Sequence, residues 1–179
     1  MARIFTKTGD GGETGRFDGT RVPKDDPLIE VNGVIDECNS AIGVARSFNG
    51  DERLDGILKP FQHLLLAAGA EVANAGRREF ITDSDIQALE ALIDELEREL
   101  PPLKNLILPA GGKVSAHLHL ARTASRKVER RLVALQETVE INKTLLAYFN
   151  RLSDTLFVLA RLAAHQNGGS DEVWVAPKG

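Results

Sequence analysis

The sequence has 179 residues, of which 42% are apolar, and a net charge of -4. This length allows one domain with a substantial core and is too short for two, so we expect a single domain over residues 1–179. The acidic balance argues against a broad nucleic-acid-binding surface, and no apolar run signals export or a membrane span, so we expect a cytoplasmic protein with neither nucleic acid nor membrane as a partner.

The first 26 residues show neither helical nor strand periodicity and are expected to form a loop. Between Thr6 and Gly15 the segment combines glycines, hydroxyl side chains and Lys7. Glycines let backbone N–H groups approach phosphate oxygens, and a lysine supplies a positive charge. The spacing matches neither a Walker A loop nor a dinucleotide-binding fingerprint. A phosphate-binding loop and a disordered tail both remain open on this pattern alone. Taken alone, Lys24 is read first as a solvated lysine.

Five segments with helical periodicity follow. Asp26 and Pro27 form an N-cap and first-turn pair, and the first helix is expected to end near Phe48. The second covers Leu54 to Val72 with Gly76 as a C-cap, and Pro60 must lie in its first turn or kink it. The remaining three helices are expected from a Thr82 or Asp83 cap to Leu100, from Val114 to Leu135, and from about Lys143 to Gln166.

Strand alternation is nearly absent, and Val173–Val175 is the one short candidate. The pattern therefore predicts an all-α protein, an antiparallel five-helix bundle over 27–167 with a C-terminal tail over 168–179. Cys38, the only cysteine, lies in an amphipathic pattern and is expected to be a buried small apolar side chain.

Three arginines spaced four apart, Arg122, Arg126 and Arg130, define what we call the arginine stripe. This spacing stacks them on one side of a helix, with Glu129 beside them. Neighbouring guanidinium groups repel one another unless an anion lies opposite, so the stripe predicts a polyphosphate or carboxylate partner.

Other polar groups fall within the helical patterns. Asp36 or Glu37 is placed to pair with an arginine of another helix, either as an ordinary salt bridge or to fix an arginine before a ligand arrives. Asn150, Ser153 and Asp154 share a side of the last helix and are expected to meet a ligand, an interface or a structural polar network. His117 and His119 are two residues apart and point to different sides, which argues against metal ligation.

Five motifs then occur in order: Thr-Lys-Thr-Gly-Asp-x-Gly with Arg-Val-x-Lys-Asp, Val-x-Asp-Glu-x-Asn-Ser-x-Ile-Gly, Leu-Pro-x-Gly-Gly, Arg-x-x-x-Arg-Lys-x-Glu-Arg, and Tyr-Phe-Asn-Arg-Leu-Ser-Asp. Together the set resembles the PduO-type ATP:cob(I)alamin adenosyltransferases across residues 6–154. The resemblance implies a five-helix bundle that forms a homotrimer with active sites between subunits. It also implies transfer of the 5′-deoxyadenosyl group of ATP to Co(I) of cob(I)alamin or another corrinoid, with release of triphosphate and with Mg²⁺ as cofactor.

The resemblance also assigns residues to the site. The catalytic residues it implies are Arg126, Asp36 and Lys24, with Asp36 holding Arg126 in a salt bridge. The ATP-binding residues it implies are Thr6, Lys7, Thr8, Gly9, Thr14, Gly15, Lys24, Arg126, Glu129, Arg130 and Asn150. A cob(II)alamin reductase and an adenosylcobalamin-dependent mutase are further partners that the reaction implies.

The chain departs from the family pattern at two positions. Leu106 stands where an aromatic residue that helps displace the lower ligand of cobalt is common, and Lys127 stands where a second arginine is usual. The Leu106 departure keeps an alternative open, a nucleotide-binding corrinoid carrier or sensor bundle without efficient catalysis. A helical scaffold with no small ligand is the third reading. Trp174 is expected either to cover the corrin face or to anchor the C-terminus.

Overall fold

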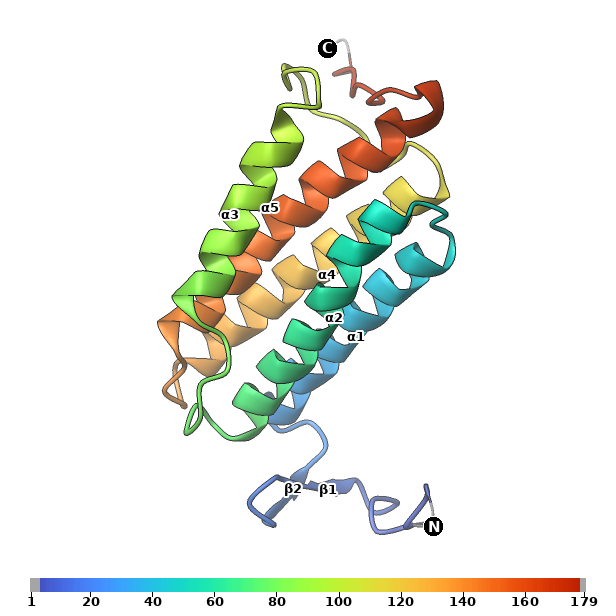
Figure 1. Ribbon diagram of the computed structural model, residues 1–179. Helices are drawn as coiled ribbons and strands as arrows, with labels where there is room; N and C mark the ends of the chain where they lie inside the picture. Colours follow the sequence, from blue (N-terminus) through green and yellow to red (C-terminus); the bar gives the residue numbers. More distant parts are fainter. Residues whose placement is uncertain (1–3, 178–179) are drawn as a thin grey trace.

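The computed structural model describes residues 4–177. The ends of the predicted domain, residues 1–3 and 178–179, lie outside the described residues. Five long helices form an antiparallel bundle (Figure 1), as the sequence predicted. Their bounds are α1 Pro27–Ser47, α2 Glu52–Ala73, α3 Asp83–Glu97, α4 Lys113–Leu135 and α5 Lys143–His165, followed by a 3₁₀ turn, Gln166–Gly168. Helix α4 packs against both α1 and α5, while α2 packs on α1 and α3 packs on α5.

Local signals set the helix boundaries. The Asp26 carboxylate accepts a hydrogen bond from the Leu28 amide at 3.0 Å, with Pro27 as the first helical residue. Thr82 begins α3 through a reciprocal capping box with Asp85. The amide of Gly76 reaches back to the Glu71 carbonyl at 3.2 Å to close α2, which requires the left-handed backbone that glycine adopts readily (φ 70°).

Two helix predictions need adjustment. Pro60 lies inside α2, beyond the first turn, and the helix continues through it. Helix α3 ends at Glu97, before the predicted end at Leu100, because the last turn tightens: the Leu100 amide bonds to the Glu97 carbonyl, three residues back, at 3.3 Å.

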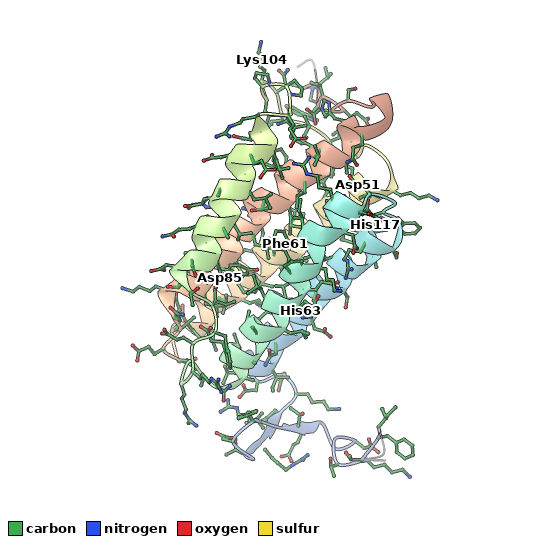
Figure 2. All side chains as sticks on the ribbon, viewed as in Figure 1. Asp51, Phe61, His63, Asp85, Lys104 and His117 are labelled. Atoms are coloured by element: carbon green, nitrogen blue, oxygen red, sulfur yellow. The ribbon has the colours of Figure 1, made fainter. Side chains whose placement is uncertain are left out.

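The apolar sides of the helices meet in one core, where Figure 2 shows Phe61 within the bundle. Complete burial of a leucine such as Leu132 contributes about 2 kcal/mol to stability. Cys38 is fully buried as predicted, and burial raises the pKa of its thiol to about 12, so it packs as a small apolar group.

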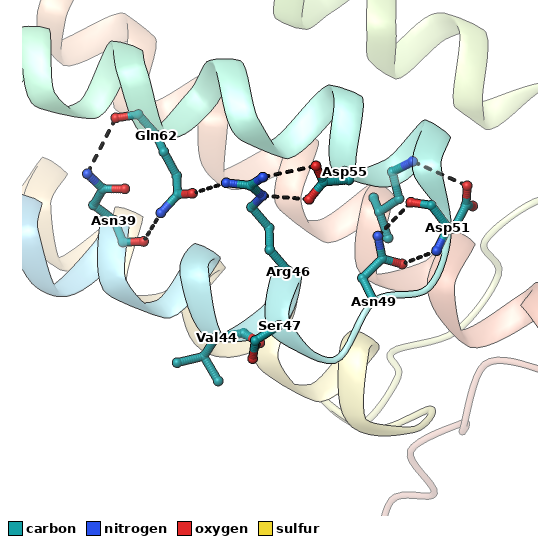
Figure 3. Close-up of polar contacts among 9 residues, drawn as sticks. Asn39, Val44, Arg46, Ser47, Asn49, Asp51, Asp55 and Gln62 are labelled. Atoms are coloured by element: carbon teal, nitrogen blue, oxygen red, sulfur yellow. Dashed lines mark hydrogen bonds and ion pairs between the residues drawn. The ribbon is translucent and has the colours of Figure 1, made fainter.

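A polar network joins α1 to α2 on one flank of the bundle (Figure 3). Arg46 pairs with both carboxylate oxygens of Asp55, at 2.7 and 2.9 Å, and donates to the Gln62 side chain at 2.6 Å. Gln62 in turn donates to the Asn39 carbonyl at 3.1 Å. Asn39 Oδ1 is buried without a partner among the described residues, and the other contacts of the network hold this flank of the bundle together.

The N-terminal segment corrects the prediction that it contains no strand. Strands β1 (Glu13–Gly15) and β2 (Arg21–Pro23) pair antiparallel, with Thr14 opposite Val22. Between them, Asp18 accepts hydrogen bonds from the Thr20 amide and hydroxyl at 3.0 and 2.6 Å. Three-residue strands are too short to show the alternation that predicts a strand, so local turn chemistry makes the hairpin.

We call residues 4–26 the N-terminal arm. The arm projects beyond the end of the bundle where α1 begins (Figure 1). A salt bridge of 2.7 Å from Arg16 to Asp26 joins it to the start of α1. Phe17, 79% exposed, shows that the arm does not bury its apolar side chains against its own bundle.

The C-terminal segment, residues 169–177, lies at the opposite end beside the α3–α4 loop, where Figure 2 also places Lys104. The strand predicted at Val173–Val175 is reduced to a single bridge between Ile107 and Val173. Within residues 4–177, no helix has the length and hydrophobicity needed to cross a membrane.

Candidate functional site

The arginine stripe forms on α4 as predicted. Arg126 and Arg130 are exposed and Arg122 is partly buried. Within residues 4–177, none of the three has an ion pair with a carboxylate. Burial lowers the pKa of Arg122, and the neighbouring charge of Arg126 lowers it further. Such a row of cations without local compensation favours binding of an anion.

Asn150 and Glu129, predicted to share the site, are in direct contact. The Asn150 amide nitrogen donates to Glu129 Oε1 at 2.9 Å, joining α5 to α4 beside the stripe. The other polar residues of this α5 segment have local partners: buried Ser153 donates to the Asn150 carbonyl at 2.8 Å, and Asp154 pairs with Arg151 at 2.8 Å. Of these α5 residues, Asn150 is therefore the one tied to the stripe.

The predicted phosphate loop forms the outer part of the arm. The Thr6 and Thr8 hydroxyl oxygens are 2.8 Å apart, and Lys7 between them adopts a left-handed backbone (φ 62°). At Gly9, an added Cβ would lie 3.4 Å from Lys24 Nζ and 3.3 Å from the Glu13 carbonyl oxygen. Lys24 thus lies against the glycine turn, and two parts of the predicted site come together.

The hairpin supports this loop. Thr14 and Gly15 belong to β1, opposite Val22 and Arg21 of β2. Arg21 donates to the Thr8 carbonyl at 2.6 Å and pairs with Glu13 at 3.2 Å. Sequence reasoning missed this function of Arg21, because its partner is a backbone carbonyl thirteen residues earlier, which leaves no signal in side-chain spacing.

Asp36 does not contact Arg126 within one chain. The groove between α1 and α4 is bridged instead by Glu37 and Lys127, 2.8 Å apart. Asp36 is exposed on the side of α1 that also carries Asn39, which contacts α2. Arg126 is exposed on the side of α4 facing α5. The two residues lie on different flanks of the bundle, so the predicted salt bridge does not form within one chain.

Leu106 lies in the α3–α4 loop at the other end of the bundle, with 72% of its surface exposed. Its carbonyl accepts a hydrogen bond from the Trp174 amide at 2.8 Å. The C-terminal segment is held in turn by Asp171, which pairs at 2.8 Å with the buried Arg161. Trp174 remains 45% exposed, so it is not a fully packed anchor, and it adds to an apolar surface beside Leu106.

His117 and His119 lie on different sides of α4. His117 is exposed and stacks on Phe48 with ring centroids 5.1 Å apart, whereas His119 is buried. No group of three or more His, Cys, Asp or Glu side chains placed to hold a metal ion occurs in residues 4–177. Neither histidine therefore belongs to a metal cluster in this part of the chain.

Comparisons with known proteins agree with this geometry. The family model for cobalamin adenosyltransferase matches residues 4–163. The chain is 42% identical over 175 residues to a corrinoid adenosyltransferase of Bacillus subtilis, covering 94% of this chain and 90% of that protein. It is 40% identical over 167 residues to a corrinoid adenosyltransferase of Citrobacter freundii, covering 90% and 95%.

Solved structures give the same result. A variant PduO-type ATP:corrinoid adenosyltransferase from Lactobacillus reuteri, complexed with cobalamin and ATP, superposes with a TM-score of 0.91 at 33% identity, covering 96% of each chain. A second variant of that enzyme, complexed with ATP, also gives a TM-score of 0.91 at 33% identity, covering 96% of this chain and all of that one.

Proposed function

This chain belongs to the cobalamin adenosyltransferase family and transfers the 5′-deoxyadenosyl group of ATP to the cobalt of a reduced corrinoid, and we propose that two copies of the chain build each ATP site. The nucleotide part of this proposal rests on the Asn150–Glu129 contact beside arginines that lack carboxylate partners within residues 4–177. The second copy is inferred from the separation of Asp36 from Arg126 within one chain. That surface is suited to phosphate oxygens.

The reaction sets the tasks of the site. Co(I) supplies the electron pair of the new bond to the 5′ carbon of ATP, and the bond from this carbon to the triphosphate oxygen breaks. The bonding electrons leave with triphosphate, and cobalt ends as Co(III). Because Co(I) is itself the nucleophile, the protein needs no general base; its residues hold the carbon in line and stabilise the charge on the leaving group.

We assign the residues accordingly. Arg126, Arg130 and Lys24 offset the charge of the triphosphate, and Asn150 and Glu129 orient the nucleotide beside them. Residues of the arm close over the phosphates from a second copy; these are Thr6, Lys7, Thr8, Gly9, Thr14 and Gly15. Leu106 contacts the corrinoid.

Asp36 fixes Arg126 across the boundary between copies. The two side chains lie on opposite flanks, so the interface joins unlike surfaces head to tail. Such interfaces form a closed ring when the rotation between copies closes, and the family resemblance implies a ring of three. We therefore propose a homotrimer in which arm, bundle and C-terminal segment of each chain act as one domain.

Mg²⁺ fits this site as a partner of the substrate. The described residues contain no carboxylate or histidine cluster that would hold the ion alone. Mg²⁺ keeps several waters and binds well to phosphate oxygens, so we propose that it enters with ATP and reduces the charge that the arginines and lysines must offset.

Anaerobic conversion tests the proposal. With cob(I)alamin and MgATP, the purified chain should form adenosylcobalamin and one equivalent of inorganic triphosphate. A protein that binds both compounds but yields neither product would be the carrier or sensor alternative that Leu106 left open.

The same assay can test the two protein partners that the reaction implies. A cob(II)alamin reductase should be able to supply the Co(I) substrate, and bound adenosylcobalamin should pass to an adenosylcobalamin-dependent mutase. We propose the cytoplasm as the location, where ATP and a reductase for the corrinoid would both be at hand.

A further inference from the structure

We propose that Arg161 and Asp171 are positioning residues for the corrinoid, because their ion pair fixes the α3–α4 loop that carries Leu106. This inference rests on the proposed function, in which Leu106 contacts the corrinoid. Neither Arg161 nor Asp171 is among the residues that the family resemblance assigns to the site. The contacts that support the inference are made inside a single chain, at the end of the bundle where the C-terminal segment lies beside the α3–α4 loop (Figure 1).

The ion pair between Arg161 and Asp171 is buried. Arg161 Nη2 lies 2.8 Å from Asp171 Oδ2, and Nε donates to the two carboxylate oxygens at 3.2 and 3.1 Å. The Arg161 side chain is 3% exposed and that of Asp171 13%, so no other ion pair between described residues is as deeply buried. Burial acts to raise the pKa of Asp171, but hydrogen bonds from Arg161 and His165 lower it overall, so Asp171 is a carboxylate at neutral pH.

Arg161 joins two segments that are far apart in the sequence. Besides Asp171 in the C-terminal segment, its Nη2 also donates to the Pro101 carbonyl at 2.8 Å, where the α3–α4 loop begins. A buried ion pair is a poor source of stability, because removing two charges from water is costly and apolar side chains of similar volume stabilise a core as well. The planar guanidinium supplies something that an apolar side chain does not, namely a fixed direction toward each of its two partners.

The two segments that Arg161 holds also pair with each other beside Leu106. The Leu108 amide donates to the Glu172 carbonyl at 2.8 Å, and the Trp174 amide donates to the Leu106 carbonyl, also at 2.8 Å. Glu172 directly follows Asp171 in the chain. The position of Asp171 therefore sets the position of the short backbone pairing, and that pairing sets the backbone of Leu106.

Close packing against α5 supports the same arrangement. An added Cβ at Gly111, in the Leu-Pro-x-Gly-Gly motif of the loop, would collide with the Ala164 side chain. An added Cβ at Gly169, two residues before Asp171, would collide with the Ala164 carbonyl oxygen. The loop and the C-terminal segment thus both approach α5 at one residue, three positions after Arg161. This fit leaves little room for a shifted loop as long as the ion pair is in place.

Trp174, the only tryptophan of the chain, tests the hold on the C-terminal segment without any substrate. Asp171→Asn removes the negative charge, so the segment should loosen and the Trp174 ring, now 45% exposed, should meet more water. Its fluorescence emission should shift to longer wavelength, and acrylamide should quench it more strongly. Asp55→Asn is the matched control, because it removes the carboxylate from another arginine pair, with Arg46, and should change neither reading. Unchanged Trp174 emission in folded Asp171→Asn would show that the ion pair does not hold the segment, and the inference would be wrong.

Steady-state kinetics test the effect on the corrinoid. Asp171→Asn should lower kcat/KM for the corrinoid about ten-fold, because a small displacement of a contacting group has that effect, while KM for MgATP stays within about two-fold of wild type. Arg161→Met combined with Asp171→Leu leaves no buried charge, so this double variant should melt close to wild type and still show the lower corrinoid kcat/KM. A pair with a merely structural role would give wild-type kinetics in the double variant.

A double-mutant cycle tests the link to Leu106. Leu106→Ala alone should lower kcat/KM for the corrinoid, and adding Asp171→Asn should lower it no further, because the position of an absent side chain has no effect. If the two losses multiply instead, the ion pair acts through some other contact, and its assignment to Leu106 is wrong.

The outcomes separate this inference from the proposed function. If wild type forms adenosylcobalamin and Asp171→Asn keeps its kcat/KM for the corrinoid, the inference is wrong and the function stands. Equal losses for the corrinoid and for MgATP also overturn it, since they indicate a general structural defect. If wild type forms no product, the proposed function fails, and quenching of Trp174 by cob(II)alamin still gives a corrinoid Kd. A Kd that is the same in wild type and Asp171→Asn would then overturn the inference as well.

Discussion

The side chain of Asn150 on α5 donates to the carboxylate of Glu129 on α4 across 2.9 Å. Asn150 is exposed and Glu129 is only half-buried, so the bond adds about 0–1 kcal/mol to stability. Its larger effect is geometric, since it holds a carboxylate and an amide beside two arginines that lack ion pairs within residues 4–177.

Replacing Asn150 by aspartate tests this geometry. Asn150→Asp places two carboxylates together beside the nucleotide, so steady-state assays should show kcat/KM for MgATP lowered by about ten-fold or more with an unchanged melting temperature. Glu90→Gln is a matched control, because Glu90 makes a comparable exposed contact to Arg151 across helices at 3.0 Å. Equal nucleotide kinetics in Asn150→Asp and wild type would remove Asn150 from the site.

Mixed assemblies test whether Asp36 and Arg126 act across two copies. Asp36→Asn and Arg126→Ala should each lower turnover about 100-fold, because a fixed arginine no longer meets the leaving group. When the two variants are co-expressed with different tags and co-purified, about a quarter of the sites should combine a wild-type Asp36 from one chain with a wild-type Arg126 from its neighbour. Activity should recover in those sites. No recovery in a verified mixed assembly would place both residues in one chain's own site.

Leu106→Phe tests the exposed position on the α3–α4 loop. The wider, flat ring should contact the corrinoid over more area than leucine and raise the rate of adenosylation, measured anaerobically by absorbance. Leu103→Phe, at another exposed leucine of the same loop, is the control for added apolar surface. An unchanged or slower reaction in Leu106→Phe would show that this loop handles the lower face of cobalt in another way.

Glu71 should matter for folding rather than for catalysis. It is 1% exposed and accepts from the Phe80 and Ile81 amides at 2.7 and 3.0 Å and from the Asn142 side chain at 3.1 Å. Glu71→Ala leaves the two amides without an acceptor, while the Asn142 side chain keeps only its 3.4 Å contact to the Ile81 carbonyl, and the free energy of unfolding should fall by about 3 kcal/mol in urea titrations. Glu71→Gln, which keeps one acceptor oxygen, should cost less; equal losses would assign the effect to packing.

His119 should make stability depend on pH. Its folded-state pKa of about 4 lies below the ordinary value of 6.5 because of burial first and the Arg122 charge second, with Asp171 acting in the opposite direction. At a pH between these two pKa values, His119 is protonated in the unfolded chain but neutral in the folded one. The free energy of unfolding should therefore fall as the pH drops from 6.5 to 4, by up to about 1.4 kcal/mol per pH unit. Urea unfolding of wild type and His119→Asn at pH 5 and 7 should show a shallower dependence in the variant. Parallel slopes would contradict the burial of a neutral ring.

The helices were predictable because their signals are local. Asp26 with Pro27 and Thr82 with Asp85 set helix starts through atoms within a few residues of each other. The β1–β2 hairpin was not predictable in this way, because each strand is too short to show periodicity. The bridge from Ile107 to Val173 depends on segments brought together only by the bundle.

The same contrast between local signals and contacts of distant segments applies to the candidate site. The spacing of the stripe was readable, whereas the separation of Asp36 from Arg126 depends on which helix flanks each one. The hydrogen bond from Arg122 Nε to His119 Nδ1, at 3.3 Å, does have a sequence signal, a spacing of three on one helix. His119 is also two residues from His117, and that histidine spacing points to the question of metal ligation and not to Arg122.

Asp26 divides its two oxygens between two tasks. Oδ1 accepts from the Leu28 amide at the start of α1, while Oδ2, 2.7 Å away from Arg16, holds the N-terminal arm. Loss of Arg16 would thus release the arm but leave the helix capped, whereas loss of Asp26 would remove both bonds at once. A single substitution at position 26 would therefore weaken the start of α1 and release the arm that carries the predicted phosphate loop.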